Sequence, residues 1–162
     1  MAHLTKREKT WKAKLPPGKQ YPVDDALKLY DSWLSRDPRS QVAANNLAML
    51  LVSYHTDKAS LERARTLTAG FANANNGDLL DTAGWVQFKR GEFAQALPVL
   101  QRAAALMPQS HEVHYHLGMA ELRNGQSGRA RTDLESALAG ASRFFGEEDA
   151  RAALASLRSQ TT

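Results

Sequence analysis

The chain has 162 residues, of which 43% are hydrophobic and 23% are charged, a balance typical of one soluble, folded domain. It contains no cysteine, which excludes disulfides, thiolate catalysis and thiolate-ligated metals. No apolar run approaches the roughly 20 residues that cross a bilayer, so we expect no transmembrane segment.

Positive charge is concentrated in an N-terminal arm, residues 1–22. This arm contains six basic residues and one acidic residue, whereas the formal charge of the rest of the chain is −1, which gives a net charge of +4 for the whole chain. The folded body is therefore not basic, which argues against a nucleic-acid partner. The string KREKTWKAK, with Trp11 between lysines, is either a contact for phosphates or an anionic membrane surface, or a solvated, partly disordered leader or repeat remnant. The arm has no apolar block of signal-peptide type.

Helices are expected along the remainder of the chain, at roughly 23–36, 40–54, 59–74, 78–90, 92–106, 111–123, 127–140 and 147–158. Gly91 and Gly125 fall where a helix must stop, because glycine tolerates a left-handed backbone. Pro98 lies inside the predicted 92–106 helix, where a proline loses a hydrogen bond and predicts a kink.

An internal repeat of 34 residues underlies this order. The following pairs stand 34 positions apart: Gly84 and Gly118, Gly91 and Gly125, Ala96 and Ala130, Leu100 and Leu134, Ala103 and Ala137. Small residues at these spacings allow two antiparallel helices to cross closely. The pattern therefore predicts stacked helix-turn-helix units.

The same spacing resembles the tetratricopeptide repeat (TPR) consensus. That consensus has small residues at repeat positions 8, 20 and 27, Gly at 15, an aromatic at 17, a large apolar residue at 24 and Pro at 32. Counted from Gly77, the matching residues are Gly84, Gly91, Phe93, Ala96, Leu100, Ala103 and Pro108. The resemblance implies an all-α fold, a right-handed α-solenoid of TPR helix pairs closed by a C-terminal capping helix.

The TPR domain is predicted to cover residues 23–158. Its parts are a half repeat at 23–38, repeats at 39–76, 77–110 and 111–144, and the capping helix at 147–158. The first of the three repeats is degenerate, because Ala64 arrives four residues late and Asn76 stands in the proline position. Since the half repeat lacks its first helix, we expect the chain to begin inside a longer solenoid.

The resemblance also nominates a binding groove, because the first helices of TPR pairs line a concave surface. The nominated side chains are Asn45, Met49, Val52, Asp81, Trp85, Phe88, Lys89, Tyr115, Met119 and Arg123. Rigid aromatics often dominate interface energy, which favours Trp85, Phe88 and Tyr115 as anchors for a peptide or protein segment. The alternative is that these aromatics pack against neighbouring helices.

Other sites find little support in the sequence. A carboxylate clamp of the kind found in some TPR domains lacks its earliest lysines, although Asn45, Asn46, Lys89 and Arg123 are present. The histidines at 111, 114 and 116 lack a cysteine or further ligand to complete a metal site, so we interpret them as solvated or packing residues. We find no catalytic constellation and no phosphate loop, and we expect no cofactor and no enzyme activity. Glu147, Glu148 and Asp149 suit the start of the capping helix.

The predicted function is therefore non-catalytic binding of a protein or peptide in the TPR groove. Three strings, NNLAMLL, LDTAGWVQFKRGEFAQALPVLQRA and HEVHYHLGMAELRNG, are similar to the last repeats of bacterial TPR proteins of exopolysaccharide export and PEP-CTERM systems. That similarity implies a scaffold in the bacterial envelope or periplasm; otherwise the chain would be cytoplasmic. The alternative function is a structural or self-associating segment of a polysaccharide-export assembly.

Overall fold

The computed structural model describes residues 23–140 and 144–159, so the basic arm and its predicted roles lie outside the described residues. The described residues form eight α-helices and one 3-10 helix, with no strand among them. They are α2 (Val23–Arg36), α3 (Gln41–Tyr54), α4 (Lys58–Leu67), η1 (Phe71–Asn73), α5 (Gly77–Lys89), α6 (Phe93–Leu106), α7 (His111–Arg123), α8 (Ser127–Leu138) and α9 (Glu147–Ser159). The predicted all-α class is confirmed.

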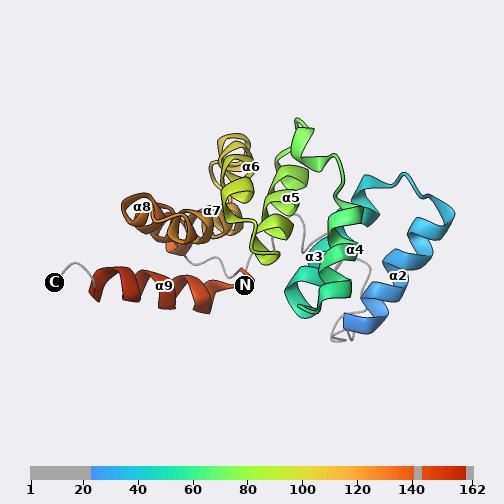
Figure 1. Ribbon diagram of the computed structural model, residues 1–162, viewed down its shortest axis with the longest axis horizontal. Coiled ribbons are helices and arrows are strands. Elements are labelled where there is room, and N and C mark those ends of the chain that lie inside the picture. The colour runs from blue at the N-terminus through green and yellow to red at the C-terminus, as the bar shows by residue number, and fades with distance from the viewer. Residues whose placement is uncertain (1–22, 141–143, 160–162) are drawn as a thin grey trace.

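The helices stack in chain order as hairpins, as an α-solenoid requires (Figure 1). Each first helix of a pair contacts the first helix of the next pair, through α3 with α5 and α5 with α7. The largest buried apolar cluster extends from Tyr30 on α2 to Leu157 on α9. None of the described helices combines the length and the apolar character that a membrane span requires.

Local sequence fixes where the helices begin and end. The side chains of Ser40, Asp57, Asn76 and Ser110 each accept a hydrogen bond from the backbone N–H three residues later, which satisfies a free donor of the first turn. Gly91 ends α5 with φ +82°, and the Glu92 N–H donates to the Gln87 carbonyl at 2.9 Å. That bond is typical of a glycine-dependent helix stop.

Glycine also sets the close crossing inside the second and third hairpins. A Cβ on Gly84 would lie 2.6 Å from Leu100 Cγ, and one on Gly118 would lie 2.9 Å from Leu134 Cγ. Both leucines are fully buried, which stabilises each hairpin by roughly 1.5–3 kcal/mol per leucine. The 34-residue offset is thus the repetition of one helix-crossing geometry.

The first hairpin departs from the predicted helix at 59–74. Helix α4 ends at Leu67, and a turn with Gly70 at φ +86° leads into η1. Phe71 is buried in a cluster with Leu79, Leu80 and Val99, so the chain turns to insert this ring against α5 and α6. The prediction of a continuous helix is wrong here, because burial of the Phe71 ring competes with helix continuation.

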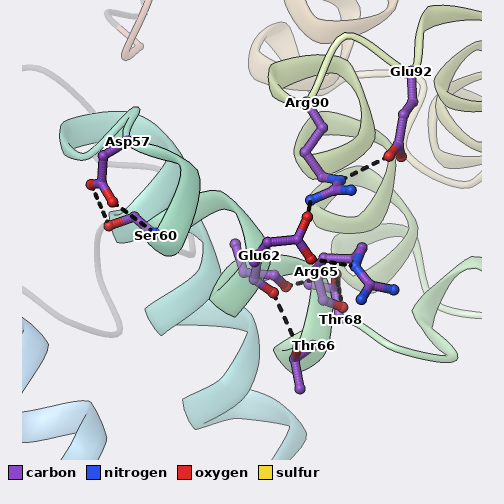
Figure 2. A network of polar contacts seen from close by, with 9 residues as sticks. Asp57, Ser60, Glu62, Arg65, Thr66, Thr68, Arg90 and Glu92 are labelled. Carbon is purple, nitrogen blue, oxygen red and sulfur yellow. Dashed lines mark hydrogen bonds and ion pairs between the residues drawn. The ribbon is translucent and has the colours of Figure 1, made fainter.

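An ionic network joins the first hairpin to the second (Figure 2). Arg90, at the end of α5, pairs with Glu62 on α4 and donates from Nε to Glu92 Oε1 at 2.8 Å. Arg65 pairs with the other Glu62 oxygen at 2.9 Å. The hydrogen bond from Arg90, and then that from Arg65, hold the pKa of Glu62 below its usual value.

The two ends of the solenoid are single helices. Helix α2 packs Ala26 and Tyr30 on α3, with the Tyr30 hydroxyl accepting from Asn46 Nδ2 at 3.3 Å. Helix α9 buries Ala150, Leu154 and Leu157. Helix α6 runs on through Pro98 in its second turn, on the exposed side, and the predicted kink stays a prediction.

Candidate partner-binding face

The nominated side chains come from α3, α5 and α7, which we call the first-helix face. Six of them are buried: Asn45, Met49, Val52, Asp81, Trp85 and Tyr115. Phe88, Lys89 and Met119 are half-buried, and Arg123 is exposed. The structure thus brings these residues onto neighbouring helices, while only the last four keep accessible surface of any size.

Trp85 lies at the centre of an aromatic stack between two repeats. Its ring stacks on Phe88 at a centroid distance of 4.7 Å and on His116 of α7 at 4.0 Å. Lys89 Nζ stands 5.1 Å from the Trp85 ring centroid. Trp85 is 3% exposed, so its packing role, which the sequence left open, is realised here.

Tyr115 is covered by the segment that leads into α9. Its ring lies 5.5 Å from that of Phe144, and its hydroxyl donates to Asp149 Oδ2 at 3.4 Å. A Cβ on Gly146 would fall 2.3 Å from Tyr115 Cε1, so the backbone lies directly on the ring. Burial, and then the charge of Asp149, raise the pKa of Tyr115 well above its usual value.

Phe145, the residue after Phe144, contacts the repeat that contains α3. The Phe145 ring lies 5.4 Å from Tyr54 at the end of α3, and both rings are about half exposed, at 51% and 50%. We call Phe144, Phe145 and Gly146 the Phe-Phe-Gly turn. It contacts α7 and α3, two repeats apart. Sequence reasoning missed it; the available signal was a pair of phenylalanines at positions that the repeat consensus does not specify, followed by glycine.

An accessible patch remains at the C-terminal ends of α5 and α7. Phe88 meets Phe93 edge-on at 5.2 Å, and the Arg123 guanidinium lies 4.1 Å from the Phe93 ring centroid. Asn124 donates to the Phe93 carbonyl at 2.9 Å, which fixes the start of α6. With Lys89, these side chains combine aromatic surface and two positive charges; we call Phe88, Lys89, Phe93 and Arg123 the edge patch.

Each histidine on α7 makes a contact between helices. His116 Nδ1 is 2.7 Å from Asp81 Oδ1 on α5, and both side chains are almost fully buried. His114 contacts Asp133 on α8 at 2.6 Å, and His111 contacts the Ser136 carbonyl at 3.1 Å. Across 23–140 and 144–159, no three His, Asp or Glu side chains are arranged to hold a metal ion.

A carboxyl pair lies between α7 and α8, formed by the buried Glu121 and the partly exposed Asp133. Glu121 is 2% exposed, and its Oε2 has no hydrogen-bond partner. Burial, followed by the hydrogen bond and negative charge of Asp133, raises the pKa of Glu121 to about 8, against a smaller opposing effect of Arg129. Because Glu121 is buried between the two helices, we expect its ionisation to affect the stability of this hairpin.

Two further features bear on the sequence predictions. Asn46, a candidate for a carboxylate clamp, is engaged with Tyr30 of α2. An open surface hollow is lined by Gly125, Gln126, Ser127, Gly128 and Arg129 at the α7–α8 turn, none of which is a nominated residue. Neither feature adds a ligand site to the first-helix face.

Two sequence comparisons indicate the same repeat that the stacked helix pairs show. Residues 82–144 fit a sequence family described as tetratricopeptide repeat. The chain is 30% identical over 136 residues to the TPR repeat-containing protein PA4667 of Pseudomonas aeruginosa, covering 73% of this chain but 23% of that protein.

Two crystal structures share the fold. That of MamA has a TM-score of 0.62 at 18% identity, over 98% of this chain and 86% of that one. That of the thermophilic TPR protein TTC0263 from Thermus thermophilus has a TM-score of 0.60 at 24% identity, over 86% of this chain and 74% of that one. At these identities the likeness concerns the fold alone.

Proposed function

Because the chain is a tetratricopeptide-repeat protein, we propose that it is a non-catalytic module that binds a peptide or protein segment on its first-helix face. Tetratricopeptide repeats generally bind proteins or peptides and are generally not enzymes. The chain spans 23% of the length of the curated relative.

The observation that carries the proposal is the edge patch. Phe88 and Phe93 offer aromatic surface that the fold leaves partly open, and Lys89 and Arg123 stand over neighbouring rings. Aromatic and arginine side chains are enriched among residues that dominate binding energy. The patch therefore suits a ligand with apolar side chains and negative charge.

The test is a capture experiment with charge-reversed variants. Lys89→Glu with Arg123→Glu should lose partners that the wild type retains from a lysate of the source organism. Lys28→Glu with Lys58→Glu, at exposed positions on α2 and α4, is the matched control and should retain them. Circular dichroism must give the same helicity for both. Equal capture by the two variants, or no specific capture by the wild type, would contradict the proposal.

The alternative of self-association has one supporting observation. Leu29 on α2 and Val42 on α3 are about half exposed, at 48% and 50%, at the N-terminal end of the solenoid. A role in an envelope exopolysaccharide assembly rests on the resemblance of the strings NNLAMLL, LDTAGWVQFKRGEFAQALPVLQRA and HEVHYHLGMAELRNG to the last repeats of such proteins. Light scattering across a concentration series tests self-association, since Leu29→Ser with Val42→Ser should abolish any dimer that forms through this end.

A further inference from the structure

The Phe-Phe-Gly turn lies on the first-helix face. Its two rings contact Tyr115 on α7 and Tyr54 on α3, from a segment that belongs to neither helix pair. Figure 1 shows α9 with its N-terminal end directed toward the middle of the solenoid, and the turn directly precedes that end in the chain. The turn is a short peptide seated on the surface nominated for peptides.

We propose that the first-helix face binds a partner segment with two adjacent aromatic residues followed by glycine and acidic residues, and that the Phe-Phe-Gly turn is its intramolecular competitor. This inference rests on the proposed function and names its ligand class. A partner segment of this kind must displace the turn, so the part of the face around Tyr115 and Tyr54 is available only in molecules in which the turn has left it, while the edge patch stays accessible.

The glycine requirement follows from close backbone approach. Gly146 has φ +98°, and any side chain there would overlap the Tyr115 ring, at 2.3 Å from Cε1 and 2.6 Å from Cζ. Only glycine combines that conformation with so close an approach of the backbone to an aromatic ring. A competing segment in the same place needs the same residue after its aromatic pair.

Charge favours an acidic continuation of the ligand. The turn is followed by Glu147, Glu148 and Asp149, and Asp149 accepts from the Tyr115 hydroxyl. Lys89 and Arg123 supply positive charge at the edge patch of the same face. Electrostatic complementarity of this kind steers encounter and selects among partners.

The turn can leave without loss of the capping helix. The C-terminal half of α9 is held separately, through buried Leu154 and Leu157 and through Arg131, which donates to the Leu157 carbonyl at 3.1 Å. Arg158 also pairs with Glu135 of α8 at 3.1 Å. Since Phe145 and Tyr54 are half exposed, their contact contributes less than a fully buried one.

The experiment measures binding of a labelled peptide of residues 141–150 to the full chain by fluorescence polarisation. In the wild type the turn competes with the peptide for the face. The apparent Kd is therefore the intrinsic Kd divided by the fraction of molecules in which the turn has left. Phe144→Ala with Phe145→Ala should bind the peptide at least about tenfold more tightly than the wild type. A peptide with both phenylalanines replaced by alanine should not bind, and Leu106→Ala, at an exposed position on α6, should behave as the wild type.

A second opening variant guards against misfolding. Gly146→Ala keeps both phenylalanines but expels the turn from Tyr115, and it too should tighten peptide binding, with helicity and melting temperature monitored. Equal affinity of wild type and both folded opening variants, or equal binding of the alanine peptide, would overturn the proposal. A dimer in the opened variants would also overturn it, because the occupant would then be a second copy.

The outcome separates the two proposals. The charge-reversed variant at Lys89 and Arg123 could lose its partners while the Phe144/Phe145 and Gly146 variants fail to bind the peptide. That result would support the proposed interaction function and reject the aromatic-aromatic-glycine segment as its ligand. Peptide binding without any effect of the charge reversal would reject the edge patch as the contact surface.

Discussion

The first hairpin, α3–α4, and the two that follow it are built on the same repeat but are held together differently. In the second and third hairpins, Gly84 and Gly118 admit Leu100 and Leu134 at distances that no side chain would allow. The first hairpin has buried Ala48 in place of the glycine and a second helix of 10 residues, against 14 in α6 and 12 in α8.

The junctions between hairpins differ in the same sense. The polar contact between the second and third hairpins, Asp81 with His116, is buried, whereas the polar contacts between the first and second, through Glu62, Arg90 and Glu92, are partly exposed and are supplemented by the buried Phe71 ring. Burial strengthens electrostatic contacts and makes loss of one partner costly, while surface ion pairs contribute little. Loss of a polar contact should therefore cost more between the second and third hairpins than between the first and second, and four substitutions test the difference between these regions.

The largest effect is expected at the buried junction. Asp81→Ala leaves His116 without its partner at 1% exposure, and we expect a loss of about 3–5 kcal/mol in the free energy of unfolding, measured in urea. Replacing both groups, Asp81→Leu with His116→Phe, should recover most of that loss. A loss below about 1 kcal/mol for the single substitution would mean that the pair does not hold the junction.

The next effect concerns the helix crossing. Gly84→Ala places a methyl group 2.6 Å from Leu100 Cγ, and we expect a loss of about 1–3 kcal/mol from overpacking. Gly128→Ala is the control, because nothing lies within 4 Å of its Cβ position in the first turn of α8. This change should be neutral or stabilise by up to about 1 kcal/mol. If Gly84→Ala and Gly128→Ala have the same effect on stability, the close helix crossing at glycine is not what distinguishes the second and third hairpins from the first.

A pH dependence is expected from the carboxyl pair of the third hairpin. The pKa of Glu121 in the folded chain, about 8, is raised above the ordinary 4.5, so the folded state retains this proton more strongly than the unfolded state. The contribution to stability is full below about pH 4.5 and is lost as the pH rises through about 8.

Glu121→Gln should remove this loss because the amide does not ionise. We expect the variant to exceed the wild type by about 1–3 kcal/mol at pH 9 and to match it near pH 4, in urea unfolding. Asp133 and Arg129 face the same group, and His114 contacts Asp133, so Asp133→Asn should reduce the pH dependence in the same direction. If the stability of Glu121→Gln fell with pH as steeply as that of the wild type, Glu121 would not be the group responsible for the pH dependence.

The smallest effect is expected at the surface junction. Arg90→Gln should lower the free energy of unfolding by at most about 1 kcal/mol and speed hydrogen exchange in α4 more than in α8. High salt should reduce the difference between variant and wild type. Arg39→Gln, in the exposed α2–α3 turn, should leave exchange in α4 unchanged; an equal effect of the two substitutions would show that the Glu62 contact does not hold α4.

Much of the fold was determined by the sequence alone, because it depends on local chemistry and on repetition. Gly91 and Gly125 stop helices in any context that allows a left-handed backbone, and residues 34 apart repeat one crossing geometry. These signals predicted the helices from 77 to 123 to within one residue at each end. The same spacing placed the nominated side chains on α3, α5 and α7.

Only the tertiary structure decided which of those side chains are open. Trp85 and Tyr115 stand at repeat positions that usually line the groove, yet both are buried by partners distant along the chain. His116 covers Trp85, and the Phe-Phe-Gly turn covers Tyr115. Helix α4 ends early for a similar reason, because Phe71 inserts between α5 and α6. Periodicity records which face of a helix a residue occupies, but burial depends on what long-range packing places over that face.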